Sequence, residues 1–317
     1  MAERLGLHDA PPEPIAPGLS SNAWRIRVPG GDAVLRMPVD AADGVGTYPM
    51  EHALLAALTE LGAPVPAPIQ GSWQLPGWPL GAFSLTSLVP GIRLRPESAS
   101  WAAPQVATFL HQLHSLPIKG HGPLADHDGR LAGIASGAED GLRAAFANQP
   151  LWPFGGASLA VHPALADRPE LIAAIAGHAP SIRRAALNQQ KVIVHADLHE
   201  ENILEAEGRL EFIDFGECFA GAPGWDFAAL AYFGGWPWAE RILEAYRARA
   251  RSQPDADDVA ALALSFGLYR WQQDRRLGVD GDAHDEGFLL ETLARLGRGP
   301  SSRRRPAPGR PPARRRS

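Results

Sequence analysis

The sequence predicts an α+β fold in two lobes: a small lobe of antiparallel sheet plus one helix, then a larger, mainly helical lobe. Three observations support this prediction. A chain of 317 residues can bury a sizeable core and folds more naturally as two lobes than as one. Residues 17–61 show a strand–turn–strand pattern followed by a helical one. After Asp226 the pattern is mostly helical as far as Leu296.

We place the N-terminal lobe at residues 1–88, the C-terminal lobe at residues 89–297 and a tail at residues 298–317. The tail is rich in Pro, Arg and Ser, with eight arginines and no acid, which predicts disorder. The whole chain has a net charge of −5, with 30 basic and 35 acidic residues. Without the tail, 22 basic and 35 acidic residues remain, a net charge of −13.

The first element after the Pro-rich lead-in is a hairpin over residues 17–38, with a tight turn at Pro29–Asp32. Its first strand is entered through the small residues Gly18-Leu19-Ser20-Ser21-Asn22. Their backbone N–H groups and hydroxyls can approach a phosphate closely, although an ordinary turn before a strand would read the same way.

A helix follows, for which Thr47 is a suitable cap, Pro49 fits the first turn and Gly62 ends the pattern. Its apolar face comprises Leu54, Leu55, Leu58 and Leu61.

The C-terminal lobe begins after a strand-like segment at residues 82–91. A helix is predicted over residues 101–117, with Val106, Phe109, Leu110 and Leu113 on one face. Residues 118–160 read as Gly-rich loop around one helix, and residues 167–190 as a helix.

The most informative segment starts at Lys191. A β-branched run ends in His195-Ala196-Asp197, and Asn202 follows five residues after the aspartate. A second strand-like run, Leu210–Ile213, leads directly into Asp214-Phe215-Gly216. Two strands therefore deliver a carboxylate, an amide and a second carboxylate to neighbouring loops.

These residue types suit phosphoryl transfer, in which the protein mainly positions groups and neutralises charge. Asp197 can accept the proton of an attacking hydroxyl. Asn202 and Asp214 can supply the hard oxygen ligands that Mg²⁺ takes besides water and phosphate. Two solvated loop carboxylates are the alternative, but that requires the whole spacing to arise by chance.

The segment HADLHEENIL, followed by IDFGE, Gly-x-Pro and WDFAAL, resembles the aminoglycoside phosphotransferase and choline kinase superfamily. The resemblance implies a protein-kinase-like fold in which Asp197 is the catalytic base. It also implies that Asn202 and Asp214 bind magnesium and that Asp226 is a buried brace for the catalytic loop.

The same resemblance assigns roles in the N-terminal lobe. It places Ser20, Ser21 and Asn22 over the nucleotide phosphates. Kinases place a cation on the second strand of this lobe. Because the only lysines are Lys119 and Lys191, Arg36 is the candidate here, and arginine can fork onto phosphate oxygens.

The resemblance also makes Glu51 the partner of Arg36, although a solvated glutamate in the first turn of a helix is an open alternative. It places backbone groups near Ser87 and Val89 at the adenine edge of the nucleotide.

The sequence departs from the family pattern at two places in the catalytic loop. Ala196 replaces the usual glycine, which we expect to be a small change. Glu200 and Glu201 stand where Pro-Gly is common; if that glycine has a positive φ, Glu201 would be strained there.

His195 and His199, four residues apart, would suit a zinc pair on a helix. The preceding β-branched run indicates a strand and then a loop, and no HExxH is present, so we interpret both as structural hydrogen-bonding residues. Tryptophans and acids after Asp226 could line a substrate pocket, but core packing for the tryptophans and solvation for the acids are favoured one by one.

Composition excludes several other classes. The single cysteine excludes a disulfide framework and a Cys-based zinc site, and the absence of GxxxxGK excludes a P-loop ATPase. No apolar run reaches the ~18 residues of a membrane span, and the first residues show no apolar signal region. We expect no membrane or nucleic-acid partner and a cytoplasmic location.

The expected function is a small-molecule kinase that uses Mg²⁺ and ATP or GTP to phosphorylate a hydroxyl. The resemblance implies an aminoglycoside-like or other antibiotic acceptor, and hence antibiotic resistance. A metabolite acceptor of the choline, thiamine or sugar type is the alternative, and a nucleotide-binding pseudokinase is the hypothesis from another class. The charge of −13 on residues 1–297 favours a cationic acceptor.

Overall fold

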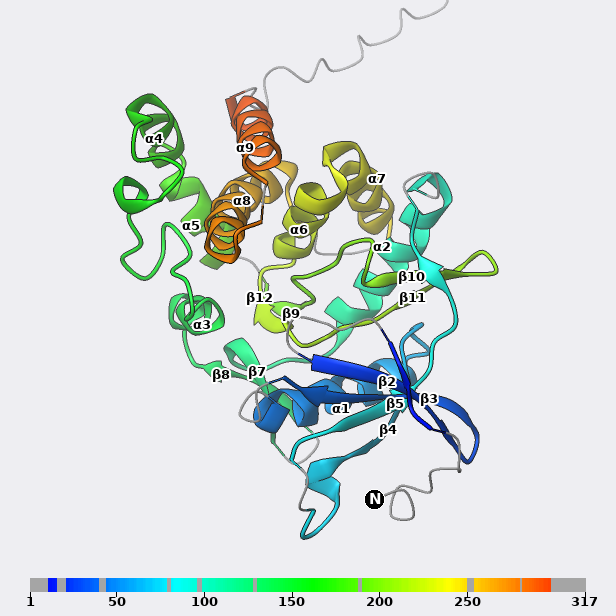
Figure 1. Cartoon of the computed structure of the whole chain (residues 1–317). Coiled ribbons are helices and arrows are strands. Elements are labelled where there is room, and N and C mark those ends of the chain that lie inside the picture. The colour runs from blue at the N-terminus through cyan, green and yellow to red at the C-terminus, as the bar shows by residue number, and fades with distance from the viewer. Residues whose placement is uncertain are drawn as a thin grey trace, which may run out of the picture.

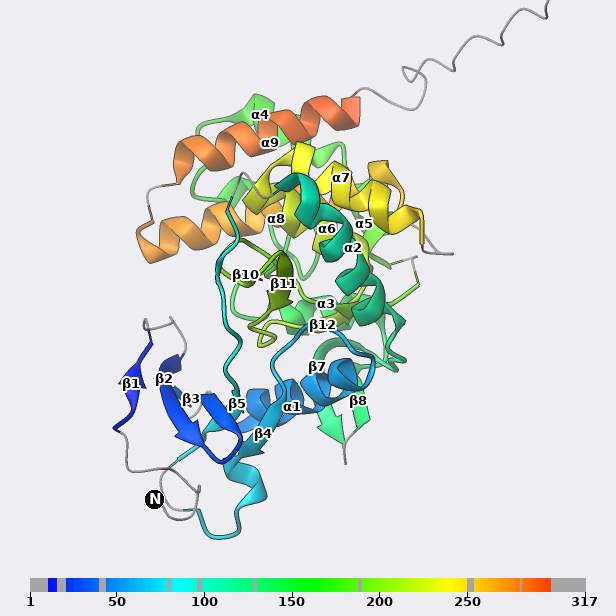
Figure 2. The same ribbon diagram turned by 90° about the vertical axis from the view of Figure 1, so that its right-hand side faces the viewer.

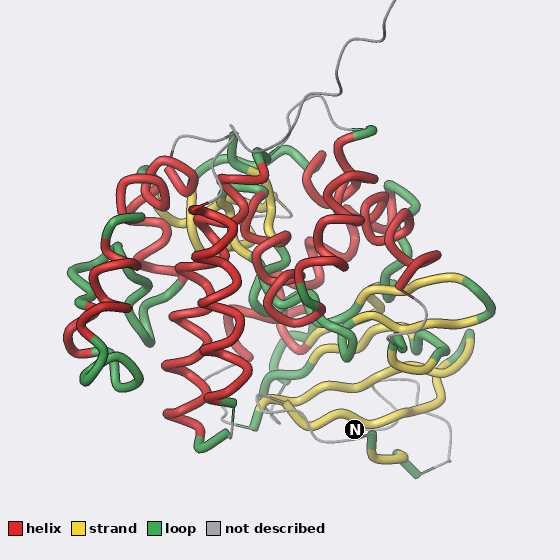
Figure 3. Tube along the Cα trace, turned by 90° about the horizontal axis from the view of Figure 1, so that it is seen from above, coloured by secondary structure: helices red, strands yellow, loops and turns green. Residues whose placement is uncertain are grey.

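A computed structural model of the chain describes residues 11–15, 21–39, 44–78, 81–95, 99–127, 130–187, 190–249, 254–279 and 281–297. Figures 1 and 2 show a sheet and one helix at one end of the molecule and a group of helices at the other. Seen from above, in Figure 3, the strands near the N-terminus lie apart from most of the helices. The predicted α+β class with two lobes is confirmed.

The N-terminal sheet is antiparallel throughout, with the order β1-β2-β3-β5-β4. The hairpin turns at Pro29 and Gly30, where Gly30 adopts a φ of 108°. One face buries a small core in which Leu35, Phe83 and Leu85 are each at most 4% exposed. The strands are β1 (Glu13–Pro14), β2 (Ser21–Val28), β3 (Gly31–Pro38), β4 (Pro68–Gly71) and β5 (Ser84–Ser87).

Helix α1 (Gly44–Glu60) begins before the predicted cap, so Thr47 lies inside the helix rather than at its N-terminus. Leu54, Leu55 and Leu58 are buried, as the apolar pattern predicts. Leu61 is instead 47% exposed because the helix ends one residue earlier. Gly62 has a φ of 67°, and its N–H donates to the Thr59 carbonyl, which turns the chain out of the helix.

The segment after β5 connects the two lobes. Gly91 lies so close to the chain of β10 (Ile203–Ala206) that a Cβ there would meet the Glu205 carbonyl oxygen at 3.0 Å. The short strand β6 (Ile92–Arg93) then pairs with β10, and helix α2 (Ala99–Ser115) follows. Its predicted apolar face, which includes Phe109, is fully buried.

Residues 118–160 contain more structure than the sequence predicts. A hairpin of β7 (His121–His127) and β8 (Arg130–Ala135) precedes helix α3 (Ala138–Ala145), and a short 3₁₀ turn lies at Leu159–Val161. Another 3₁₀ turn lies outside this range, at Ser72–Gln74. The single helix predicted over residues 167–190 is two helices, α4 (Pro169–Ala176) and α5 (Ala179–Leu187), because the helical conformation is interrupted at Gly177-His178.

Two small sheets carry the loops of interest. Strand β9 (Val192–Val194) pairs with β12 (Phe219–Gly221) in a sheet of order β8-β7-β12-β9. The hairpin of β10 and β11 (Arg209–Phe212) forms the other sheet with β6. The loops after β9 and β11 therefore lie side by side, where the motif residues occur.

Four helices complete the molecule, as the pattern after Asp226 predicts: α6 (Gly224–Gly234), α7 (Trp236–Arg247), α8 (Ala256–Leu277) and α9 (Asp282–Gly297). Trp236, Trp238 and Trp271 are buried in or against the main core. Among the residues that the structure describes, no helix is both long enough and apolar enough to cross a membrane.

Candidate active site

The side chain of Asp226, on the first turn of α6, holds the loop after β9 in place. The Asp226 side chain is fully buried, and its Oδ1 accepts hydrogen bonds from the backbone N–H groups of His195 (3.0 Å) and Ala196 (2.9 Å). Its Oδ2 lies 2.8 Å from His114 Nε2. A carboxylate that binds two successive backbone N–H groups fixes the direction in which the following residue, Asp197, leaves the loop.

Backbone strain in this loop falls on Ala196, not on Glu201. Ala196 has a φ of 68°, whereas neither Glu200 nor Glu201 adopts a positive φ. Replacing the usual glycine by alanine is therefore the costly departure, contrary to our expectation, because a Cβ disfavours this conformation. The hydrogen bond from the Ala196 N–H to Asp226 helps to hold the strained residue.

Asp197 follows Ala196 in this loop, and its side chain is partly buried, with 26% of its surface exposed. Its Oδ2 accepts from Asn202 Nδ2 at 3.1 Å and lies 3.4 Å from His199 Nε2. Burial alone would raise the pKa of Asp197, but the hydrogen bond and charge of His199, with the charges of His195 and Arg270, outweigh it. The pKa of Asp197 therefore lies below its ordinary value, and the group is a carboxylate at neutral pH.

His199 has a larger part than the structural one that we predicted. Burial lowers its pKa, but the bond to Asp197 and then the charges of Glu200 and Glu201 more than offset this, so the pKa is raised. The two acidic residues at the family's Pro-Gly position thus favour a charged His199 beside Asp197. Glu201 also forms an ion pair with Arg93 of β6.

His195 is fully buried and packs against aromatic rings, with its ring centroid 5.0 Å from that of Phe215. Its Nδ1 lies 3.4 Å from the backbone nitrogen of Asp197. These contacts fit the structural interpretation of His195.

Asn202 and Asp214 bring oxygen atoms to the same region. The Asn202 Nδ2 donates to the Asp197 carbonyl at 2.9 Å as well as to the Asp197 carboxylate, so its Oδ1 is the amide atom that can bind a ligand. Asp214 has a φ of 64° and a side chain that is 50% exposed. One amide and one carboxylate fit Mg²⁺, which completes its shell with phosphate oxygens and water. In the described ranges, no three potential metal-binding His, Cys, Asp or Glu side chains cluster into a site made of protein ligands alone.

An ion pair links the N-terminal sheet to the loop that carries Asp214. Arg36 of β3 donates from Nη1 to Glu51 Oε1 of α1 at 2.6 Å, and the same oxygen accepts the Phe215 N–H at 3.2 Å. The Glu51 side chain is only 2% exposed. Glu51 is thus the partner of Arg36, and it also fixes the backbone immediately after Asp214.

The Arg36 guanidinium reaches further groups in the same place. Its Nη2 lies 3.5 Å from Asp214 Oδ1, and its Nε donates to Ser21 Oγ at 3.4 Å. Burial alone would lower the pKa of Arg36, but the charges of Glu51 and Asp214 raise it above its ordinary value. Arg36 therefore remains a fixed cation beside the carboxylate that we expect to bind metal.

The other nucleotide-binding candidates are less informative. Ser20 lies outside the described residues, while Ser21 and Asn22 lie within β2 rather than in a loop before it. The Ser87 N–H donates to the Ala67 carbonyl, and the Ser87 hydroxyl accepts the Ala67 N–H. Ser87 is thus engaged in the sheet, which leaves the backbone of Val89 as the better candidate at the adenine edge.

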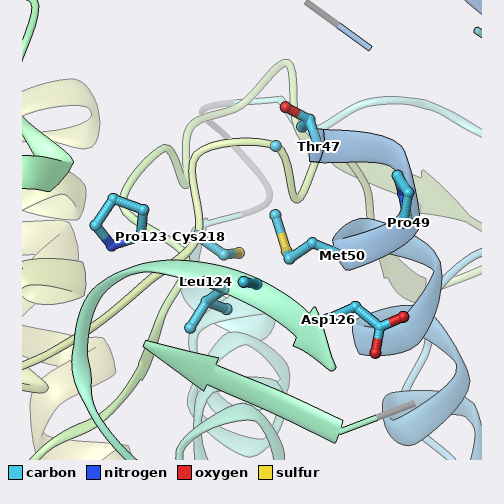
Figure 4. Close-up of a pocket in the computed structure, with 9 residues that line it drawn as sticks. Thr47, Pro49, Met50, Pro123, Leu124, Asp126 and Cys218 are labelled. Carbon is cyan, nitrogen blue, oxygen red and sulfur yellow. The ribbon is translucent and has the colours of Figure 1, made fainter. Parts of the chain in front are cut away.

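A pocket of about 410 Å³ lies on the other side of the Asp214 loop, between α1 and β7. Figure 4 shows Met50 extending from α1 toward Cys218 and Leu124. The pocket borders the network around Glu51, but Arg36, Glu51 and Asp214 do not line it. We therefore assign it no part in the site.

Three further side chains lie around Asp197, and two of them come from outside the sequence motifs. Phe233 of α6 packs against His199, with 4.9 Å between ring centroids. Arg270 of α8 lies over the Phe233 ring at 5.0 Å. Partial desolvation and then the charges of Asp197 and Asp214 raise the pKa of Glu217. No short spacing pattern marks Phe233 or Arg270, because the packing of α6 on α8 brings them to Asp197. Glu217 ends the IDFGE segment, and we predicted no role for it.

Comparison with known proteins agrees with this geometry. The sequence model of the phosphotransferase enzyme family matches residues 12–262. No protein with a curated description matches the chain.

Solved structures of similar fold cover nearly the whole chain. A thermostable mutant of aminoglycoside phosphotransferase APH(4)-Ia, in complex with ADP and hygromycin B, is 18% identical with a TM-score of 0.67, covering 94% of this chain and 97% of that one. Choline kinase LicA from Streptococcus pneumoniae is 15% identical with a TM-score of 0.58, covering 93% and 95%. The GDP complex of aminoglycoside 2'-phosphotransferase-IIIa is 17% identical with a TM-score of 0.57, covering 90% and 93%. At these identities the likeness establishes the fold.

Proposed function

This chain belongs to the phosphotransferase enzyme family, and we propose that it transfers the γ-phosphate of a nucleotide to a hydroxyl group of a small molecule. The observation that carries the proposal is the arrangement of Asp197, Asn202 and Asp214. Asp197 is an ionised carboxylate oriented by two neighbours, and Asp214 lies on the adjacent loop with its carboxylate open to solvent.

In the proposed step, Asp197 accepts the proton of the acceptor hydroxyl as its oxygen bonds to the γ-phosphorus. The bond between the γ-phosphorus and the β–γ bridging oxygen breaks, and the nucleoside diphosphate leaves with that electron pair. The hydrogen bond from Asn202 holds the Asp197 carboxylate in a fixed direction, so the base needs little reorganisation when the acceptor arrives.

Arg36 and Ser21 are the proposed contacts for the nucleotide phosphates, together with Ser20 and Asn22, and the Val89 backbone is proposed for the base. Arg36 is held by Glu51, so its remaining N–H groups face the site already oriented. Mg²⁺, which Asn202 and Asp214 would hold, supplies neutralisation of the phosphate charge when bound. We leave ATP and GTP as equal candidates for the donor.

The acceptor is the least determined part of the proposal. An aminoglycoside-like or other antibiotic is the first candidate, since two of the structural neighbours above are aminoglycoside phosphotransferases. A metabolite of the choline type is the second, since a choline kinase is another neighbour. The net charge of −13 on residues 1–297 favours a cationic compound in either case. A cytoplasmic location, where nucleotide is available, stays a prediction.

The test is a screen of purified protein for phosphate transfer from ATP and from GTP. The panel contains hydroxylated antibiotics and hydroxylated metabolites, and products are detected by mass spectrometry. Phosphorylation of at least one acceptor, dependent on Mg²⁺, is the expected result. Nucleotide binding without transfer to any acceptor would favour the pseudokinase hypothesis instead.

A further inference from the structure

A guanidinium that no sequence motif includes is linked to Asp197 by a series of side-chain contacts. The contacts run in a line: His199 lies 3.4 Å from Asp197, the Phe233 ring packs on His199, and Arg270 lies 5.0 Å above the Phe233 ring. Arg270 belongs to α8, so the long helix of the C-terminal lobe brings a positive charge to the proposed base. This placement is independent of the motif residues.

Arg270 is held in position by aromatic rings and one ion pair, but it makes no hydrogen bond to any residue that the structure describes. It stacks over Phe233 and also lies 5.8 Å from the Tyr232 ring. Its nearest carboxylate is that of Asp274, one turn later, at 3.7 Å, which is too long for a hydrogen bond. Its Nε is buried without a hydrogen-bond partner among the described residues, so the part of the guanidinium that a ligand can reach lies in the remainder of the side chain, which is 24% exposed. An oriented guanidinium with unused N–H groups is a ready donor for an oxygen-rich ligand.

We propose that Arg270 binds an anionic oxygen group of the acceptor, a carboxylate or a phosphate, and so positions the reacting hydroxyl against Asp197. The inference rests on the proposed phosphate transfer but replaces the cationic acceptor favoured above with a hydroxyl compound that carries a negative charge. The planar fork of arginine matches both anions with two parallel hydrogen bonds.

This inference opposes the cationic acceptor that the net charge favours. The net charge of −13 sums groups over the whole body, and exposed charges farther away than about 8 Å are largely screened at physiological salt. Arg270 acts at short range and is partly desolvated, so a cationic group beside it would meet a like charge. Asp274 and Glu217 are the counter-charges nearby, but neither makes a hydrogen bond to Arg270 within the described part of the chain.

The experiment compares acceptors that share one carbon skeleton and differ in charge: glucose, glucosamine, glucuronate and glucose 6-phosphate. Parallel sets of hydroxy acids, amino alcohols and diols extend the comparison. Transfer is measured with ATP and GTP, and binding is measured by calorimetry in the presence of a non-hydrolysable nucleotide. Anionic members should be the preferred acceptors, with glucuronate and glucose 6-phosphate separating carboxylate from phosphate.

Arg270→Gln should raise KM for an anionic acceptor about tenfold or more, while KM for its neutral counterpart changes less than about twofold. Arg270→Lys, which keeps the charge but loses the fork, should fall between. Arg276→Gln is the matched control, since Arg276 is an exposed arginine on the same helix.

A preference for neutral or cationic members overturns the inference and leaves the phosphotransferase proposal intact. Equal effects of Arg270→Gln on anionic and neutral acceptors also overturn it, because they indicate a structural role. Absence of both binding and transfer for every anionic member counts against it as well. Absence of transfer to any acceptor at all counts against both proposals, and thermal melting of each variant checks that it is folded.

Discussion

Asp197 keeps its charge although it is partly buried, because His199 contributes a hydrogen bond and a positive charge at 3.4 Å. Glu200 and Glu201 in turn raise the pKa of His199. The positive charge of His199 stabilises the carboxylate of Asp197, and the negative charges of Glu200 and Glu201 stabilise the charged form of His199. The site therefore tolerates two acidic residues next to the carboxylate that we propose as the base.

Replacing His199 tests this coupling. Relative to their ordinary values of 3.8 and 6.5, the pKa of Asp197 is lowered and that of His199 is raised. Stability from the Asp197 carboxylate is present above pH 3.8 and is lost as pH falls through its lowered pKa. Stability from charged His199 is fully present below pH 6.5 and is lost as pH rises through its raised pKa. The pair is therefore strongest between these two values.

In His199→Gln, the burial of Asp197 is less well compensated, so its pKa should rise and the acid limb of kcat/KM should move to higher pH. Profiles of the parent and the variant, with a thermal melt at each pH, provide the measurement. Glu207→Gln, at an exposed hairpin turn away from this pair, is the control. An acid limb at the same pH in both proteins would show that His199 does not tune Asp197.

Because Ala196 has a positive φ, a glycine at this position should stabilise the protein, whereas replacing alanine by glycine usually destabilises it. Alanine at a φ of 68° costs about 1–2 kcal/mol, and glycine costs about 0.4–1 kcal/mol through the unfolded chain. Ala196→Gly should therefore raise the free energy of unfolding by about 0.5–1 kcal/mol, measured by urea denaturation. Ala157→Gly is the control. Ala157 lies in a loop without a positive φ, so this substitution should destabilise the protein. Destabilisation of Ala196→Gly would refute the assigned strain.

At the scale of elements, β3 and α1 act together on the loop after β11. Glu51 of α1 binds both Arg36 of β3 and the backbone of Phe215, so a shift of the helix moves the residue next to Asp214. This is a coupling between lobes built from one buried carboxylate.

Arg36→Ala should lower turnover and also cost about 3–5 kcal/mol of stability, because it leaves Glu51 buried without its cation. The double variant Arg36→Met with Glu51→Gln removes both charges, keeps an amide oxygen for the Phe215 N–H and should recover most of that stability. Turnover should stay low in the double variant, because no cation faces the phosphates. Denaturation and kinetics on the same preparations separate the two effects. Recovery of turnover together with stability would return Arg36 to a purely structural role.

Asp197, Asn202 and Asp214 come together because their spacing is local. Arg36 and Glu51, predicted from the resemblance, reach the Asp214 loop from the N-terminal lobe. Asp197 and Asn202 are five residues apart, and Asp214 follows the next hairpin, so short strands alone place them side by side. Arg270 and Phe233 reach the same place through the packing of α6 on α8, which no local pattern encodes. The sequence therefore predicts the chemical centre better than the surface that selects the acceptor.

Physical reasons also explain why the sequence does not predict some of the elements. The hairpin of β7 and β8 contains glycines and charged residues without regular alternation, so it resembles a loop. The start of α1 was placed too late because Pro49, which fits a first turn, lies inside the helix. The break between α4 and α5 at Gly177 was missed because both helices continue one apolar pattern.

At the scale of the whole molecule, the charges divide between an acidic body and a basic terminus. Every contact of the site described above is made by residues before 298. Deletion of residues 298–317, which removes eight arginines, should leave kcat/KM for a small acceptor within about twofold, since all the contacts that we describe for the site are made by other residues. Kinetics of the truncated and full chains at two salt concentrations provide the measurement. A large loss in a folded, truncated protein would show that the tail contributes to the site.

The most direct test of the central claim is phosphate transfer by Asp197→Asn. The account predicts that the variant folds and binds nucleotide as the parent does, with transfer to the best acceptor lower by about 10²–10⁴-fold, the contribution of a general base. Nucleotide affinity, measured in the same preparation, separates loss of the base from loss of the site. Transfer by Asp197→Asn at close to the parent rate would contradict the account.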